Sequence, residues 1–256
     1  MNRKIFGCIV AFVFLTFLTM FPLTVGVVAN RSVSTTWGNI KTGTGVNSDS
    51  AKLAPPVGSY TKLVVPFYPQ VSPDSPPGDW KLSMNCGQAS VLTCVGYAKR
   101  VYYPYPAPII VKENEWLAKN TNTKDGPKYL NKYGYFTGGG RISYLEDLAR
   151  NYWGFKNSVA IKGNSCGTID ALYNELTAGR PVIVEVITNM APAAVEGGDT
   201  YHFMVLVGMR IRANNVCSDV WVNDVGKPNG RGNHYWLEQF KESWATSGNH
   251  CVFIRK

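Results

Sequence analysis

The sequence predicts an α+β fold in which an N-terminal helical half packs against a C-terminal antiparallel β-sheet. Two observations lead to this prediction. Apolar residues recur at helical spacing in the first part of the chain, whereas β-branched runs between turn residues fill the second part. Helices that come first and strands that come last are typical of α+β domains, since α/β domains alternate the two.

The N-terminal segment, residues 1–29, is predicted to be a secretory signal. Arg3 and Lys4 are followed by an almost wholly apolar run over residues 5–21, and small residues lead up to Ala29. This order is typical of a signal peptide that is cleaved near Ala29. The run is also long enough to remain as an uncleaved membrane anchor. In both cases the folded part lies outside the cytoplasm, so we expect a secreted or extracytoplasmic protein.

Residues 30–62 are predicted to be a flexible leader, and residues 63–256 a single domain. The leader is rich in Ser, Thr, Gly and Asn and has little to bury. The remaining length suits one domain with a sizeable core. This domain begins with an extended stretch, 63–70, whose prolines bar it from the centre of a sheet, and a proline-rich loop follows.

Four helices are predicted in the order of the chain. They cover residues 86–99, 110–119, 143–152 and 168–178. The second has only weak helical spacing. Ser143 and Glu146 have the spacing of a capping box at the start of the third helix, and Gly179 ends the fourth.

Four strands are predicted after the helices, and a turn is predicted between the second strand and the third. They cover residues 181–187, 201–211, 216–223 and 252–254. The second strand is apolar on both faces, as is typical of a covered central strand. Residues near Ala213 suit a tight turn, so the second and third strands are expected to form a hairpin.

Cys86 is the candidate nucleophile, because it opens the first predicted helix from a polar turn. Unpaired backbone N–H groups and the positive end of the macrodipole at a helix N-terminus favour the reactive thiolate. Cys166 also precedes a predicted helix and is a rival nucleophile. It ranks lower than Cys86, because it is not preceded by a segment like residues 65–70, which end at Gln70. A bridged or simply buried Cys86 is the structural alternative.

His202 is the candidate base and Asp224 the candidate orienting acid. A cysteine hydrolase needs an imidazole near the thiolate and a group that orients the imidazole. Of the three histidines in the chain, His202 opens the central strand, where a sheet would hold it in place. A hairpin centred near residue 213 places His202 opposite Asp224, with Cβ atoms about 4.5–5.5 Å apart. Asn223 remains the alternative orienting residue, because the turn centre is fixed only to within about two residues.

Five segments resemble the bacteriocin-processing-like (double-glycine-type) peptidases, a family of the papain-like cysteine peptidase superfamily. The segments are residues 65–70, 85–90, 179–183, 201–203 and 222–224. The resemblance implies a papain-like fold with Cys86 as nucleophile, His202 as base and Asp224 as orienting acid. It also implies that Gln70 donates to the oxyanion hole together with the backbone N–H of Cys86. Gln88 is the second candidate, because a longer insertion than is usual in such families separates Gln70 from the cysteine.

The sequence therefore predicts an exported cysteine peptidase that hydrolyses peptide bonds through a thioester acyl-enzyme. Two alternatives stay open. One is a cell-wall peptide amidase or endopeptidase with the same triad. The other is a non-enzymatic exported binding module whose aromatic residues, Trp221, Tyr235 and Trp236, line a surface.

The composition limits the cofactors and partners that we expect. No Cys-x-x-Cys pair, zinc-type histidine pair or phosphate-binding glycine loop occurs, so neither a metal nor a cofactor is expected. Removal of the signal, which contains Arg3 and Lys4, leaves 24 basic and 17 acidic residues. The resulting net charge, 24 − 17 = +7, could draw an exported protein to an anionic cell wall or membrane surface. Its basic residues are scattered, so nucleic-acid binding is not expected. We expect a monomer that acts on a peptide or protein substrate.

The six cysteines include Cys8, which a cleaved signal would remove, so an odd number would remain. An odd number in an exported protein favours one reactive thiol beside up to two disulfides. Cys217 and Cys251 are the preferred bridge, since both begin strand-like runs. Cys94 and Cys166 could form the second bridge or stay as buried thiols.

Overall fold

The computed structural model describes part of one unit of the chain, Ser50–Lys256. The described residues are 60–70, 85–121, 130–131, 133–136, 140–163, 168–187, 190, 201–212 and 218–256. The predicted signal and most of the predicted leader lie outside these ranges, as do Cys166 and Cys217. No helix within the described ranges is both long and apolar enough to cross a membrane.

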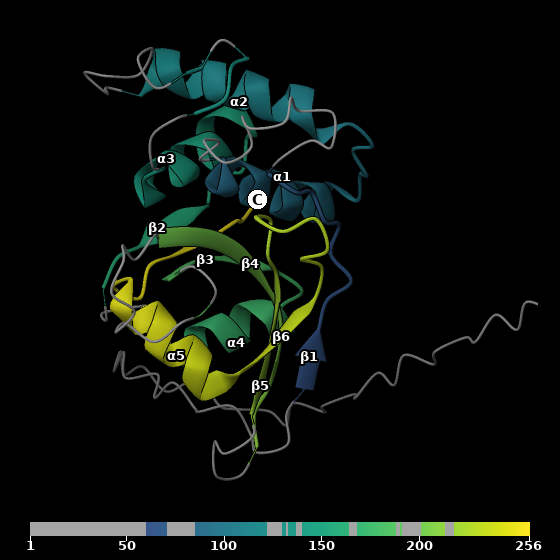
Figure 1. Cartoon of the computed structure of the whole chain (residues 1–256), viewed down its shortest axis with the longest axis vertical. Helices are drawn as coiled ribbons and strands as arrows, with labels where there is room; N and C mark the ends of the chain where they lie inside the picture. The colour runs from purple at the N-terminus through teal and green to yellow at the C-terminus, as the bar shows by residue number, and fades with distance from the viewer. Residues whose placement is uncertain are drawn as a thin grey trace, which may run out of the picture. The chain divides into compact units, whose positions relative to one another are not determined.

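Antiparallel strands form one seven-stranded sheet in the described part of the chain (Figure 1). The strands are β1 (Tyr60–Lys62), β2 (Val159–Ile161), β3 (Val182–Ile187), β4 (Tyr201–Arg210), β5 (Asp219–Asn223), β6 (Asn233–Trp236) and β7 (Cys251–Phe253). Their order is β2-β7-β3-β4-β5-β6, and β1 pairs with the end of β4. The central strand β4 therefore contacts β3, β5 and β1.

Helices cover both faces of the sheet (Figure 1). They are α1 (Cys86–Lys99), α2 (Pro106–Asn120), α3 (Ile142–Asp147), the π-helical turn η3 (Leu148–Tyr152), α4 (Ile169–Thr177) and α5 (Leu237–Thr246). Side chains of α1 and α3 pack on one face, and α2 lies against α1. Side chains of α4 and α5 pack on the other face.

Alternate residues of the central strands divide the core into two layers, because successive strand side chains point to opposite faces. Ile183 and Val205 cluster with apolar residues of α1 and α3. Their neighbours Val184 and Leu206 cluster with Phe240 of α5 and with residues of α4. Both layers are apolar, so the middle of the sheet is buried on both faces, as the sequence predicts for residues 201–211.

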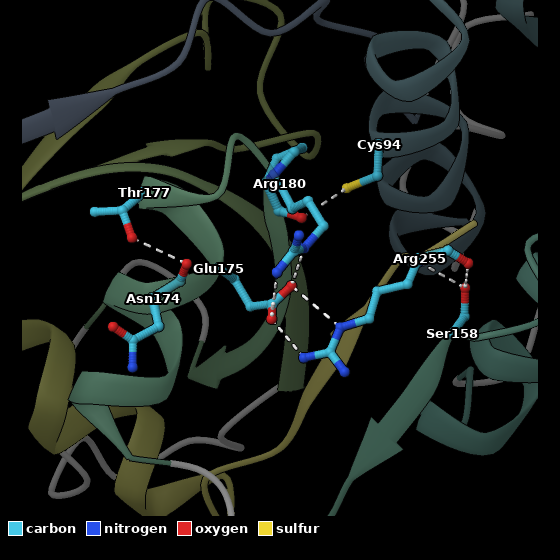
Figure 2. Close-up of polar contacts among 8 residues, drawn as sticks. Cys94, Ser158, Asn174, Glu175, Thr177, Arg180 and Arg255 are labelled. Atoms are coloured by element: carbon cyan, nitrogen blue, oxygen red, sulfur yellow. Dashed lines mark hydrogen bonds and ion pairs between the residues drawn. The ribbon is translucent and has the colours of Figure 1, made fainter. Parts of the chain in front are cut away.

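A buried carboxylate joins α4 to the C-terminal end of the chain (Figure 2). Glu175 accepts hydrogen bonds from Nε of Arg180 at 2.6 Å and from Nη2 at 3.1 Å, and it also binds the guanidinium of Arg255. Burial raises the pKa of Glu175, but the hydrogen bonds and charges of the two arginines outweigh burial and lower it. The ionised carboxylate therefore ties the residues before β3 and after β7 to α4.

The predicted α+β class and the antiparallel sheet are confirmed. The predicted helices at 86–99 and 168–178 are α1 and α4, and Thr168 caps α4 by accepting from the N–H of Ala171. One detail differs: the helices do not all belong to one half, since α4 and α5 cover the opposite face. The strand β1 occupies the last residues of the predicted leader.

The predicted capping box at Ser143 is wrong. The helix begins at Ile142, its N-cap is Arg141, and no side chain caps it. Ile142 and Leu145 are both buried in the layer beneath α1. We attribute the earlier start to the burial of Ile142, which places Ser143 inside the first turn instead of before it.

Glu113 of α2 is buried between α2 and Trp153. One carboxylate oxygen, Oε1, accepts from Trp153 Nε1 at 2.5 Å. The other, Oε2, is buried and has no hydrogen-bond partner among the described residues. Burial raises the pKa of Glu113 to about 8, although the Trp153 hydrogen bond acts in the opposite direction.

Glu113→Gln is therefore expected to remove a loss of stability that the protein suffers at alkaline pH. An unperturbed glutamate titrates near pH 4.5, so between that pH and about 8 the folded protein holds a proton that the unfolded chain releases. The free energy of unfolding consequently falls as the pH rises through this window, by up to about 5 kcal/mol. Glutamine keeps the acceptor for Trp153 and does not titrate. Urea unfolding at pH 5 and pH 9 should show a smaller loss in the variant, and equal losses in both proteins would contradict the assignment.

Candidate active site

Cys86 is the first residue of α1 and lies beside His202 of β4. Its thiol is free and half-buried. The first backbone hydrogen bond of the helix runs from the N–H of Ala89 to the carbonyl of Asn85 at 3.0 Å. The thiol therefore lies at the N-terminus of the helix, close to the unpaired backbone N–H groups of the first turn and to the positive end of the helix dipole. The interpretation of Cys86 as a disulfide partner does not hold.

His202 links the thiol to a buried carboxylate. Its Nε2 lies 2.8 Å from Oδ1 of Asp224, and its ring also hydrogen-bonds the Cys86 thiol. Since Nε2 is engaged by the carboxylate, Nδ1 is the ring nitrogen left for the sulfur. The side chains of His202 and Asp224 are only 11% and 2% exposed. The three residue types predicted from the sequence thus meet in one chain of contacts.

The pKa values of the thiol and the imidazole are shifted toward the ion pair. Burial raises the pKa of the Cys86 thiol, but the hydrogen bond and charge of His202 outweigh burial, so the pKa is lowered. Backbone hydrogen bonds from Phe203 and Gly87 lower it further. For His202, burial lowers the pKa, but Asp224 and Cys86 together raise it to about 9. A thiolate beside an imidazolium is the reactive state of a cysteine nucleophile.

Asp224 is held as an anion by the loop that follows β5. Oδ1 also accepts from the N–H of Gly226 at 3.1 Å, and Oδ2 lies 3.1 Å from Nζ of Lys227. Burial raises the pKa of Asp224, but His202 and Lys227 outweigh burial and lower it. A Cβ atom on Gly226 would lie 2.9 Å from Cε1 of His202, and one on Gly230 would lie 1.9 Å from the Asp224 carbonyl oxygen. Both glycines are therefore needed for this close packing.

The predicted register between His202 and Asp224 is wrong, although the two side chains do meet. The hairpin pairs Val205 with Asn223, and β5 ends at Asn223. Continued at that register, Met204 would face residue 224. The pair of Arg210 with Asp219 centres the hairpin between residues 214 and 215, later than expected, and the bulge between Leu206 and Gly208 moves the register back toward the predicted one by only one residue. Asp224 consequently approaches His202 from the loop after β5 and not from a cross-strand position.

Asn223, the alternative orienting residue, uses its amide elsewhere. Its Nδ2 donates to the carbonyl of Pro66 at 3.2 Å, and its Oδ1 accepts from the N–H of Gly232 at 2.9 Å. These bonds tie the segment before Gln70 to the end of β5. Asp224, not Asn223, is therefore the residue that contacts the imidazole.

The two glutamines predicted for the oxyanion hole lie in different surroundings. The backbone N–H of Gln70 donates to the carbonyl of Val225 at 2.7 Å, which places Gln70 next to Asp224 in the fold. Gln88 is buried, and its Nε2 donates to Oδ1 of Asn114 at 2.7 Å. The amide of Gln88 therefore belongs to the contact between α1 and α2.

Cys94, two turns farther along α1, shows what an unreactive thiol looks like in the same helix (Figure 2). It is buried, its Sγ donates to the carbonyl of Pro181 at 3.9 Å, and burial raises its pKa. Cys166, the rival nucleophile, and Cys217, which was predicted to bridge to Cys251, lie outside the described residues. No group of three His, Cys, Asp or Glu side chains that could hold a metal occurs within the described ranges.

The sequence interpretation missed Gly226, Lys227 and Asn114. Gly226 and Lys227 follow Asp224 directly, and a glycine and a cation after a candidate acid were the available signal. Asn114 gave no signal, because its role depends on a contact between two helices.

Comparison with known proteins shows which family the chain resembles. The model of the Peptidase_C39-like family matches residues 62–252. A solved structure from Bacillus anthracis, described as C39-like peptidase, is 19% identical and covers 77% of this chain and 98% of its own, with a TM-score of 0.49. No curated protein matches the sequence. The assignment to a family rests on the match over residues 62–252.

Proposed function

The chain belongs to the Peptidase_C39-like family, and from this premise we propose that it is an exported cysteine peptidase with a Cys86-His202-Asp224 triad. The observation that carries the proposal is the contact of the Cys86 thiol with His202, whose Nε2 lies 2.8 Å from Asp224. The opposite pKa shifts of the thiol and the imidazole support the same roles.

In the proposed mechanism, the Cys86 thiolate attacks the carbonyl carbon of a peptide bond. The imidazolium of His202 then gives its proton to the leaving amine, and a thioester remains on the sulfur. A water molecule next loses a proton to His202 and attacks the thioester, which releases the acid and restores the thiolate. Asp224 holds the ring orientation throughout and stabilises its positive charge.

Gln70 is proposed to hold the oxyanion together with the backbone N–H of Cys86. The backbone bond from Gln70 to Val225 supports this role, because it fixes the residue beside the triad. A donor of this kind is typically worth about 3–4 kcal/mol in the transition state. The substrate is a peptide or protein, and the chain is proposed to act as a monomer.

Action outside the cytoplasm is also part of the proposal. The basic start, apolar run and small residues of positions 1–29 support export, with or without cleavage near Ala29. The positive net charge suits work at an anionic wall or membrane surface.

Iodoacetamide offered to the folded full chain near pH 7 is expected to alkylate Cys86 first and to leave Cys94 unmodified. The lowered pKa of Cys86 keeps thiolate present there, whereas burial raises that of Cys94. The rate should fall as the pH is lowered and the thiolate takes up a proton. Peptide mapping by mass spectrometry identifies the labelled site. Labelling that spares Cys86, or that reaches Cys94 equally fast, would rule out the proposed nucleophile.

The same pair of groups sets the pH dependence of hydrolysis. The rate should decline as the pH rises past about 9, because His202 then loses the proton that the leaving amine needs. At low pH it should decline because Cys86 is protonated. These two limbs belong to the coupled pair and not to either residue alone.

A further inference from the structure

Three buried amide side chains lie directly behind Cys86, at the contact between α1 and α2. They are Asn85, Gln88 and Asn114, and their exposed fractions are 0%, 2% and 0%. Asn85 precedes the nucleophile, and Gln88 follows it within the first turn of α1. Asn114 belongs to α2. Polar side chains are rarely buried to this extent without a specific reason.

Asn114 connects both ends of this first turn. Its Nδ2 donates to Oδ1 of Asn85 at 2.8 Å and to the carbonyl of Gly134 at 3.0 Å. Its Oδ1 accepts from Nε2 of Gln88 at 2.7 Å. Asn85 Oδ1 also accepts from the N–H of Phe136 at 3.1 Å. One side chain of α2 therefore holds the residue before Cys86 and a residue after it.

The opposite side of this turn is fixed by packing. A Cβ atom on Gly87 would lie 2.6 Å from Cδ2 of Leu145, so the backbone next to Cys86 lies directly on α3. No side chain caps the start of α1. The amides on one side and Leu145 on the other thus constrain the direction in which the first turn presents its thiol.

The amide cluster is not explained by a gain in folding stability, because burying these polar groups costs free energy. Asn85 Nδ2 and Gln88 Oε1 are buried and have no hydrogen-bond partner among the described residues. A buried polar group left without a partner destabilises a protein, and apolar side chains of similar shape would avoid that cost. Hydrogen bonds, unlike apolar contacts, fix direction as well as distance. The hydrogen-bonded amides are therefore better suited to fixing the orientation of the first turn of α1 than to stabilising the fold.

We propose that Asn114 is a positioning residue for Cys86: through Asn85 and Gln88 it fixes the first turn of α1, and so holds the thiol against His202. The catalytic consequence rests on the proposed function. The effect on the thiol does not, because the reactivity of Cys86 can be measured without any substrate.

The test compares Asn114→Ala with the control Asn120→Ala in the full chain. Asn120 lies on the same helix, is exposed, and bonds only within that helix among the contacts described, from Nδ2 to the carbonyl of Trp116. The readout is the rate of Cys86 alkylation by iodoacetamide as a function of pH. Asn114→Ala should raise the apparent pKa of Cys86 by about one unit, and so slow alkylation about tenfold at pH values below the wild-type pKa, where the rate is proportional to the thiolate fraction. The control should behave as the wild type.

A purely structural role for Asn114 predicts a different result. In that case Asn114→Ala lowers the midpoint of thermal unfolding but leaves the alkylation profile of Cys86 unchanged, and the proposal is overturned. If Asn114→Ala does not fold, Gln88→Met takes its place, since it removes one bond to Asn114 and keeps the shape. A smaller rise of the Cys86 pKa supports the proposal, and an unchanged pKa in that folded variant overturns it.

Kinetics separate this inference from the proposed function. Given hydrolysis by the wild type, Asn114→Ala should lower kcat by about 10- to 100-fold, because a nucleophile displaced by about 1 Å loses rate to that extent. KM should change little, because Asn114 is buried away from any substrate. A wild type that hydrolyses no peptide, with an alkylation profile that still depends on Asn114, would remove the proposed function and keep the positioning role.

Discussion

Cys86→Ala is expected to abolish peptide hydrolysis while leaving the fold intact. The thiol supplies the electrons for the new bond to the carbonyl carbon, and alanine cannot replace it. Loss of the nucleophile in such a triad typically lowers kcat by roughly 10⁴-fold or more. Alanine suits a helix start without strain, and the side chain is only half-buried, so little stability is lost.

The matched control is Cys94→Ala, two turns along the same helix. It removes a buried thiol whose one described bond goes to the carbonyl of Pro181, so it should cost stability and not activity. Hydrolysis of an unfolded protein substrate and thermal unfolding, measured on both variants, check the prediction. Hydrolysis retained by Cys86→Ala would refute the mechanism and reopen the case for Cys166.

The meeting of Cys86, His202 and Asp224 could be predicted from the sequence because each lies at the end of a strongly patterned element. A helix start, a strand start and a strand end leave few arrangements in an antiparallel domain. The exact route to contact could not be predicted. The hairpin is centred later than its turn residues indicate, and the bulge between Leu206 and Gly208 then changes the register by one residue; such bulges leave no clear mark in an apolar strand.

Short elements account for most of what the sequence prediction missed. Strands β1, β2 and β6 are short, and each depends on a neighbour for its pairing. The helix α5 did carry a signal, since Leu237, Phe240 and Trp244 are spaced for one buried face. The glycine-rich loop before it and the exposed charges of its other face obscured that spacing.

The polar interior of α2 shows a more general limit. Because apolar residues in α2 have only weak helical spacing, the sequence alone would place the polar residues Glu113 and Asn114 on the solvent side. In the structure both are fully buried. Their burial follows from partners on other elements, Trp153 and the first turn of α1. Tertiary contacts of this kind override local patterns, and they concentrate here around the nucleophile.

Asp224→Asn is expected to lower kcat by about 10²- to 10⁴-fold without unfolding the protein. Asparagine retains an oxygen for the N–H of Gly226, but it removes the negative charge that the imidazolium faces at 2.8 Å. Burial lowers the pKa of His202, and the carboxylate is a main reason that this pKa nevertheless stands at about 9. Without that charge the pKa of His202 falls, so the alkaline decline of kcat/KM should move to lower pH. The thiolate of Cys86 should also become less populated near neutral pH.

The control for that variant is Asp219→Asn, which changes a second histidine–aspartate pair, in which Asp219 is buried and His234 is exposed. Oδ1 of Asp219 lies 2.7 Å from Nε2 of His234, and Asp219 begins the same strand, β5, whose end leads into Asp224. The control should lower stability, because Arg210 and Arg212 also lose their anion, but it should leave the pH profile of kcat/KM in place. Profiles measured from pH 5 to 10 decide the matter. If Asp224→Asn keeps the wild-type alkaline limb, the carboxylate does not set the charge of His202, and the orienting role passes to another group.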